Sequence, residues 1–200
     1  MAKLTFWFEF ASTYSYLSAM RIEPMAKAAG VEVEWKPFLL GPIFAAQGWK
    51  TSPFKLYPAK GVYMWRDLER LCAERGLGLV PLDPHTFPQN GLMAARVAIA
   101  ALEAPGGPAF VKEMYLAQFR DGQIISEPEV VMGALTRAGL SADLLSAAKD
   151  DTVKQQLRAN TEAAMEIGLF GAPSFTVRDE MFWGDDRLEQ ALAWSKAEVE

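Results

Sequence analysis

The sequence predicts an α/β fold in which a small sheet is interrupted by an inserted all-helical domain. Three observations lead to this prediction. A strand–helix–strand pattern occupies residues 4–37, helical patterns fill residues 63–168, and a strand pair with a closing helix spans residues 173–194. A chain of 200 residues that is 50% apolar can bury the core of one domain, or of one domain with an insertion.

The first unit is a βαβ motif. Residues 4–10 are apolar except for Thr5 and Glu9, which is typical of a strand covered on both faces. Residues 14–29 have a helical pattern, and residues 31–37 alternate apolar and polar side chains as a strand does. We expect the helix to connect two parallel strands by a right-handed crossover.

The middle of the chain is predicted to be a loop followed by helices. Residues 41–60 are rich in Gly, Pro and aromatic residues, and we expect a long connecting loop there. The predicted helices cover residues 63–75, 91–103, 108–121, 127–138 and 142–168, the last with a break near Asp150-Asp151.

The end of the chain returns to strands. Residues 173–177 and 181–183 predict a β-hairpin, and residues 187–194 a short amphipathic helix. The whole order, β-α-β, helices, then α-β-β-α, matches a thioredoxin fold interrupted by helices. We therefore expect a thioredoxin-like domain from residues 1–40 and 165–200, and a connecting loop with a helical insertion domain at residues 41–164.

The composition argues against several classes of function. A net charge of −5 offers no basic patch for a nucleic acid, and no apolar run is long enough to span a membrane. Because the N-terminus also lacks a secretion-signal pattern, we expect a cytoplasmic protein. The single cysteine, Cys72, rules out an internal disulfide, and no cluster has metal-ligand spacing.

The turn after the first strand carries the first candidate catalytic residue. Ser12 stands where a helix should begin, and a helix N-terminus presents N–H groups and partial positive charge. A redox-active thioredoxin has two cysteines at this turn, whereas this chain has Ser12-Thr13-Tyr14-Ser15. Ser12 is either a helix N-cap or a hydrogen-bond donor to a thiolate. In the second case the sulfur must come from outside the protein.

Three further places carry candidate binding residues. Ala172-Pro173 precedes a strand in the way that predicts a cis-proline and leaves the backbone of Ala172 to pair with an extended ligand. Asp185 and Asp186 stand before the last helix, where they either complement its dipole or bind a ligand ammonium group. Lys60 is either solvated or a partner for a ligand carboxylate.

Four motifs in order give the chain a family resemblance. They are Phe-x-Phe-x-Ser-x-x-Ser-Tyr from residue 8, Pro-Ala-Lys-Gly-x-Tyr-Met from residue 58, Gly-x-Pro-Ser-Phe from residue 171, and Phe-Trp-Gly-x-Asp-Arg-Leu from residue 182. Together they resemble the 2-hydroxychromene-2-carboxylate isomerase family, which is similar to kappa-class glutathione transferases and to DsbA. The resemblance spans residues 4–195.

The resemblance implies glutathione as the cofactor and gives roles to the residues that match. Ser12 would face the glutathione sulfur, and Ala172, before a cis-Pro173, would pair with the cysteinyl unit. Asp185 and Asp186 would hold the γ-glutamyl group.

The loop motif adds Lys60 to this set of glutathione ligands. The chain also departs from the family pattern at two places. Thr13 replaces the proline that commonly follows the catalytic serine, and Thr51 or Trp49 is the nearest match to an asparagine that contacts glutathione in the kappa class.

The implied function is the glutathione-dependent conversion of 2-hydroxychromene-2-carboxylate to trans-o-hydroxybenzylidenepyruvate, a step in naphthalene-type aromatic degradation. The partner would be a small aromatic substrate, and a homodimer is usual in the family. Two alternatives stay open: a kappa-like glutathione transferase, and a non-catalytic thioredoxin-like module that binds an extended peptide.

Overall fold

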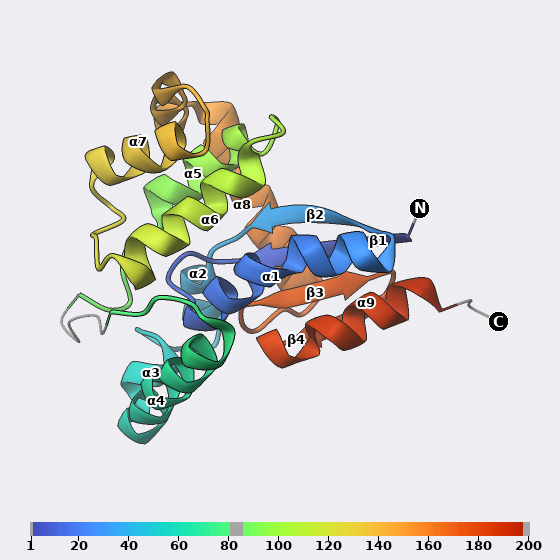
Figure 1. Ribbon diagram of the computed structural model, residues 1–200. Coiled ribbons are helices and arrows are strands. Elements are labelled where there is room, and N and C mark those ends of the chain that lie inside the picture. Colours follow the sequence, from blue (N-terminus) through green and yellow to red (C-terminus); the bar gives the residue numbers. More distant parts are fainter. Residues whose placement is uncertain (1, 81–85, 198–200) are drawn as a thin grey trace.

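The protein is described by a computed structural model that covers residues 2–80 and 86–197. One four-stranded mixed sheet forms its centre, with the strand order β2-β1-β3-β4 (Figure 1). The strands are β1 (Ala2–Phe8), β2 (Val31–Pro37), β3 (Ser174–Val177) and β4 (Glu180–Trp183). β1 pairs parallel with β2 and antiparallel with β3, and β3 and β4 form the predicted hairpin. The thioredoxin-like α/β fold is confirmed.

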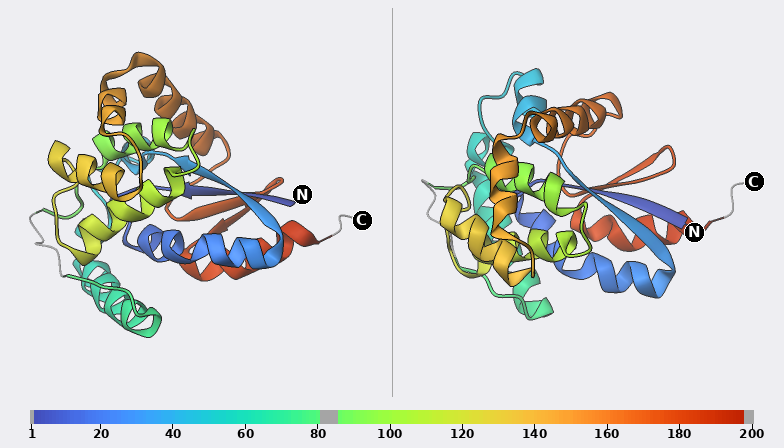
Figure 2. Two further views of the ribbon diagram at one scale, coloured as in Figure 1. Left: turned by 45° about the horizontal axis from the view of Figure 1, so that its top comes forward. Right: turned by 90° about the horizontal axis from the view of Figure 1, so that it is seen from above.

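Helices cover both faces of this sheet (Figure 2). α1 (Thr13–Ala29) and α9 (Leu188–Lys196) lie on one face, and α8 (Asp151–Glu166) lies on the other. The side chains of β1 alternate between the two faces: Phe6 and Phe8 belong to the core under α1 and α9, whereas Trp7 packs with Ala164 of α8. Burial on both faces explains why this strand is almost wholly apolar.

The helices that follow residue 90 match the expected helical segments in position, but two of them are not α-helical. They are α5 (Leu92–Ala101), α6 (Gly107–Tyr115), the π-helical turn η1 (Leu116–Arg120), α7 (Pro128–Arg137), and the 3₁₀ helix η2 (Ala142–Lys149) before α8. The predicted break in the last helix is present at Asp150, whose side chain accepts the N–H groups of Thr152 and Val153 as an N-cap. The segment expected as one helix at 108–121 changes to π-helix after Tyr115.

The prediction of a long loop at residues 41–60 is wrong, because most of this segment is helical. Two short helices, α2 (Leu40–Ala46) and α3 (Pro53–Leu56), lie there, and α4 (Pro58–Arg75) begins inside the segment. Pro53 and Pro58 occupy the first positions of α3 and α4, and Pro42 lies in the first turn of α2, where a helix needs no N–H donor. α3 and α4 pack on each other and project beside the sheet (Figure 1). The domain limits at residues 40 and 165 stay a prediction.

No helix within the described residues is long and apolar enough to cross a membrane. In the same part of the chain, no cluster of three His, Cys, Asp or Glu residues could hold a metal ion.

The contact between α5 and α6 gives a test of the packing. A Cβ at Gly107 would lie 2.5 Å from the Leu102 Cα and 2.6 Å from the Ala101 carbonyl oxygen, and backbone cannot easily move aside. Gly107→Ala is expected to lower the free energy of unfolding by about 2 kcal/mol. Gly41→Ala is the control, because its Cβ meets nothing within 4 Å. Urea unfolding measures both, and equal effects would contradict the close approach.

Candidate active site

A large pocket lies where the N-terminus of α1 meets α2, α3, α4 and the turn before β3. Its volume is about 1680 Å³, more than the roughly 300–1,000 Å³ of a typical single-ligand pocket. Much of its wall is aromatic: Phe44, Trp49, Phe54, Phe87, Phe170 and Trp183 line it. The pocket therefore has room for two small ligands side by side, one of them apolar.

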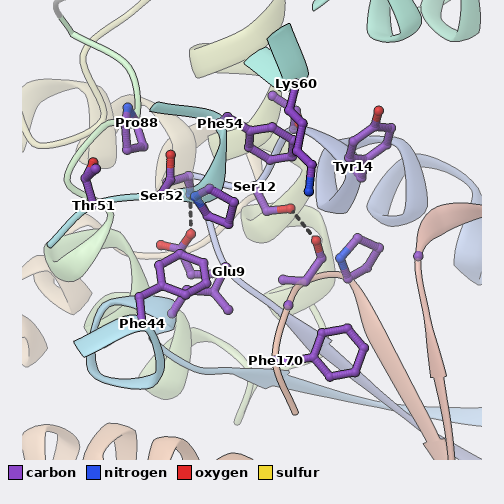
Figure 3. Close-up of a pocket in the computed structure, with 18 of the residues that line it drawn as sticks. Glu9, Ser12, Tyr14, Phe44, Thr51, Ser52, Phe54, Lys60, Pro88 and Phe170 are labelled. Atoms are coloured by element: carbon purple, nitrogen blue, oxygen red, sulfur yellow. Dashed lines mark hydrogen bonds between the residues drawn. The ribbon is translucent and has the colours of Figure 1, made fainter. Parts of the chain in front are cut away.

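Ser12 joins two distant parts of the chain at this pocket. Its hydroxyl accepts the N–H of Ser15 at 3.2 Å, so it is the N-cap of α1. The same hydroxyl donates to the carbonyl oxygen of Ala172 at 2.8 Å (Figure 3). The Ala172-Pro173 bond is cis, as the sequence predicted. The Ala172 carbonyl, which was expected to be free for a ligand, thus already accepts a hydrogen bond from Ser12.

The protein's own thiol cannot serve this site. Cys72 is buried in α4, and burial raises the pKa of its thiol to about 11. It does not line the pocket. A thiolate at the end of α1 must therefore come from a bound molecule.

Asp185 lines the pocket but is neutralised by protein groups. It begins the short 3₁₀ helix η3 (Asp185–Arg187), and its side chain is 4% exposed. One carboxylate oxygen accepts from Arg21 Nε at 3.1 Å and from Ser18 Oγ at 2.9 Å, and the other accepts from Arg75 Nη2 at 2.8 Å. Its negative charge is thus already shared by two guanidinium groups.

The remaining predicted residues also line the pocket. Asp186 is next to Asp185, but its side chain is 73% exposed and pairs with Arg187 at 3.2 Å. Lys60 lies in the first turn of α4, in place of the expected loop, and Figure 3 shows its side chain extending toward Ser12. Thr51 lies between α2 and α3. All seven residues singled out from the sequence therefore meet at one pocket.

Glu9 is a pocket residue that was not predicted from the sequence. It follows β1 directly and accepts the N–H of Ala11 through one carboxylate oxygen at 3.0 Å (Figure 3). Burial in the pocket wall raises the pKa of Glu9 to about 7, and the Ala11 hydrogen bond offsets part of this rise. The only sequence signal was a carboxylate inside an apolar stretch.

The pocket wall also contains polar atoms without partners. Thr13 Oγ1, Ser52 Oγ and Arg75 Nη1 are buried and make no hydrogen bond with any residue that the structure describes. Buried polar atoms are normally satisfied. These hydroxyl and guanidinium groups are suited to the carboxylate and peptide oxygens of a polar ligand.

The raised pKa of Glu9 has a consequence for stability. The folded protein holds this proton up to about pH 7, whereas an unfolded glutamate releases it near pH 4.3. The stabilisation is therefore complete below the unfolded pKa and is lost as the pH rises through the folded one. Relative to Glu9→Gln, the wild-type unfolding free energy should fall by up to about 3 kcal/mol between pH 4.5 and 8. Urea unfolding of both proteins at the two pH values measures this, and a constant difference would contradict it.

Comparisons with known proteins show which proteins this chain resembles in sequence and in fold. The chain is 30% identical over 191 residues to the 2-hydroxychromene-2-carboxylate isomerase of Sphingobium xenophagum, covering 93% of this chain and 94% of the relative. It is 27% identical over 202 residues to human glutathione S-transferase kappa 1, covering 92% and 86%. A solved 2-hydroxychromene-2-carboxylate isomerase structure has the same fold, with a TM-score of 0.82 at 23% identity over 96% of this chain and 93% of that one.

The resemblance inferred from the four motifs is confirmed by these relatives. A family model, the DsbA-like thioredoxin domain, matches residues 3–193. The chain belongs to the DsbA-like thioredoxin family, on the branch that contains the isomerases and kappa-class transferases.

Proposed function

We propose that the protein is a glutathione-dependent isomerase that converts 2-hydroxychromene-2-carboxylate to trans-o-hydroxybenzylidenepyruvate. The observation that carries this proposal is the junction of Ser12, the α1 N-terminus and cis-Pro173 at a large aromatic pocket. No cysteine of the described chain lines that pocket. The isomerase names of several relatives support the same reaction.

The residues present fit glutathione. This tripeptide carries two carboxylates, one ammonium group, two peptide units and a thiol, and the pocket offers complementary groups. Lys60 and the free Nη1 of Arg75 are suited to carboxylates, and Asp186 to the ammonium group. The backbone of Ala172, beside cis-Pro173, would pair with the cysteinyl unit.

Thr51 and Ser52, which connect α2 and α3, are further candidate polar contacts for glutathione. We assign the ammonium contact to Asp186 rather than Asp185, because the Asp185 carboxylate is held by two arginines.

Bound glutathione would supply a thiolate that adds reversibly to the conjugated double bond and lets it rotate. Ser12 favours the ionised thiol because its hydroxyl can turn from the Ala172 carbonyl and donate to sulfur. The hydroxyl lies at the N-terminus of a 17-residue helix, whose partial positive charge also favours an anion. The aromatic wall would hold the substrate ring and exclude water.

A kappa-like glutathione transferase is the second candidate, because the human kappa-class relative matches nearly the whole chain. Product analysis separates the two: an isomerase returns free glutathione, and a transferase releases a conjugate. A non-catalytic peptide-binding module is less well supported, because the relatives that match nearly the whole chain are named as enzymes. The degradation pathway, the cytoplasmic location and the homodimer stay predictions.

Removal of the Ser12 hydroxyl tests the thiolate assignment. Ser12→Ala should raise the pKa of the bound glutathione thiol by about one and lower turnover about 10- to 100-fold. Ultraviolet absorbance of the bound thiolate against pH measures the first effect. Ser15→Ala is the matched control, because Ser15 lies in the same helical turn but outside the pocket. An unchanged titration in Ser12→Ala would remove Ser12 from the mechanism.

The two adjacent aspartates should behave differently. Asp186→Asn should weaken glutathione binding about tenfold, about 1.4 kcal/mol, with little change in stability. Asp185→Asn should instead lower the free energy of unfolding by about 3 kcal/mol, because Arg21 and Arg75 lose their shared counter-ion. Calorimetric titration and urea unfolding measure these effects. Wild-type affinity in Asp186→Asn would leave Asp186 as an ordinary acidic residue at a helix start.

A further inference from the structure

Glu9 is held in a fixed position beside Ser12. The N–H of Ser12 donates to the Glu9 carbonyl oxygen at 3.0 Å, and the hydroxyl of Tyr115 donates to the same oxygen at 2.9 Å. One carboxylate oxygen accepts the Ala11 N–H. The other, Oε1, has no hydrogen-bond partner among residues 2–80 and 86–197. The backbone and one oxygen are therefore fixed, and one oxygen is left for a ligand.

Among the described residues, no cation forms an ion pair with Glu9, and burial is the largest influence on its charge. Figure 3 shows Phe44 beside the Glu9 side chain, on the wall of the pocket that also exposes Ser12. Tyr115 of α6 is the titratable group that packs directly against Glu9. The charged side chains elsewhere on the pocket wall are Lys50, Lys60, Asp67, Arg75, Asp185 and Asp186, and none of them makes an ion pair with Glu9.

The proposed reaction contains a proton transfer to which Ser12 and glutathione are not assigned. A 2-hydroxychromene-2-carboxylate is a cyclic hemiketal, in which one carbon carries both a hydroxyl group and the ring oxygen. Before its double bond can rotate, the ring must open. The hydroxyl proton must then leave and the ring oxygen must gain one. This task suits a group that can accept and return a proton near neutral pH.

We propose that Glu9 is the catalytic acid–base residue for this ring opening. The ionised carboxylate takes the proton of the hemiketal hydroxyl, and the oxygen–carbon bond there becomes a carbonyl. The bond from that carbon to the ring oxygen breaks, and its electron pair stays on the ring oxygen. Protonated Glu9 then returns the proton to this phenolate oxygen, so that no proton is gained or lost overall.

The environment of Glu9 agrees with this role. Burial brings the pKa of Glu9 to about 7, so both protonation states are populated at neutral pH. An ordinary glutamate would be almost fully ionised there and a poor proton donor. The proposal rests on the proposed function, because it assigns a residue to one step of that reaction.

Two substrates separate the roles of Glu9 and of glutathione. The first is 2-hydroxychromene-2-carboxylate, which must open its ring, and the second is cis-benzylidenepyruvate, which has no ring hydroxyl and cannot form the hemiketal. Both are assayed with saturating glutathione in the wild type, Glu9→Gln and Glu9→Asp. Glutamine preserves the shape and the oxygen that accepts from Ala11, but it cannot transfer a proton.

Glu9→Gln should lower kcat/KM for the hydroxychromene about 100-fold more than kcat/KM for cis-benzylidenepyruvate. Glu9→Asp, which keeps a carboxyl group, should recover part of the difference. In the wild type, kcat/KM for the hydroxychromene divided by kcat/KM for cis-benzylidenepyruvate should decrease as the pH is lowered through about 7. This pH dependence should disappear in Glu9→Gln.

Three outcomes would overturn the proposal. An equal loss with both substrates would make Glu9 a positioning residue for the Ser12 turn. Wild-type rates in Glu9→Gln would show that Glu9 transfers no proton, while the proposed isomerase function would stand. A wild-type protein that turns over neither substrate would overturn the proposed function, and the role of Glu9 with it.

Discussion

The hydrogen bond from the Ser12 hydroxyl to the Ala172 carbonyl is the contact on which the site depends. It joins groups 160 residues apart, and the antiparallel pairing of β1 with β3 brings them together. Because the hydroxyl also caps α1 through the Ser15 N–H, its orientation is set by two partners. A bound sulfur would compete for the proton that Ala172 now accepts. The Ser12 hydroxyl is therefore both the N-cap of α1 and the candidate hydrogen-bond donor to the thiolate.

The charges around the pocket are divided between structure and ligand binding. Asp185 forms ion pairs with Arg21 of α1 and Arg75 of α4, and so links two helices that contribute to the pocket wall. Asp186, one residue later, stays exposed to the pocket. Glu9 is different again, because burial has a larger effect on its charge than its hydrogen bond with Ala11. Three carboxylates in one pocket thus have three different electrostatic environments.

The sequence was a good guide wherever the local pattern determines the structure. A nearly continuous apolar run identified β1, alternation identified β2, and the turn between β3 and β4 identified the hairpin. It failed at residues 41–60, where Gly and Pro indicate a loop but in fact begin helices. The structural role of Asp185 could not be predicted from the sequence either, because its partner Arg75 lies in a helix more than 100 residues earlier in the chain. The unusual environment of Glu9 likewise arises only from tertiary packing.

The central claim is that this pocket ionises a thiol that the protein does not carry. The most direct test is calorimetric titration with reduced glutathione and with S-methylglutathione at pH 7, in buffers of different ionisation enthalpy. A free thiol has a pKa near 8.5, so ionisation on binding releases a proton that the methylated ligand cannot supply. The account predicts that reduced glutathione releases close to one proton more than S-methylglutathione. Equal proton release by the two ligands, or no binding of either, would contradict it.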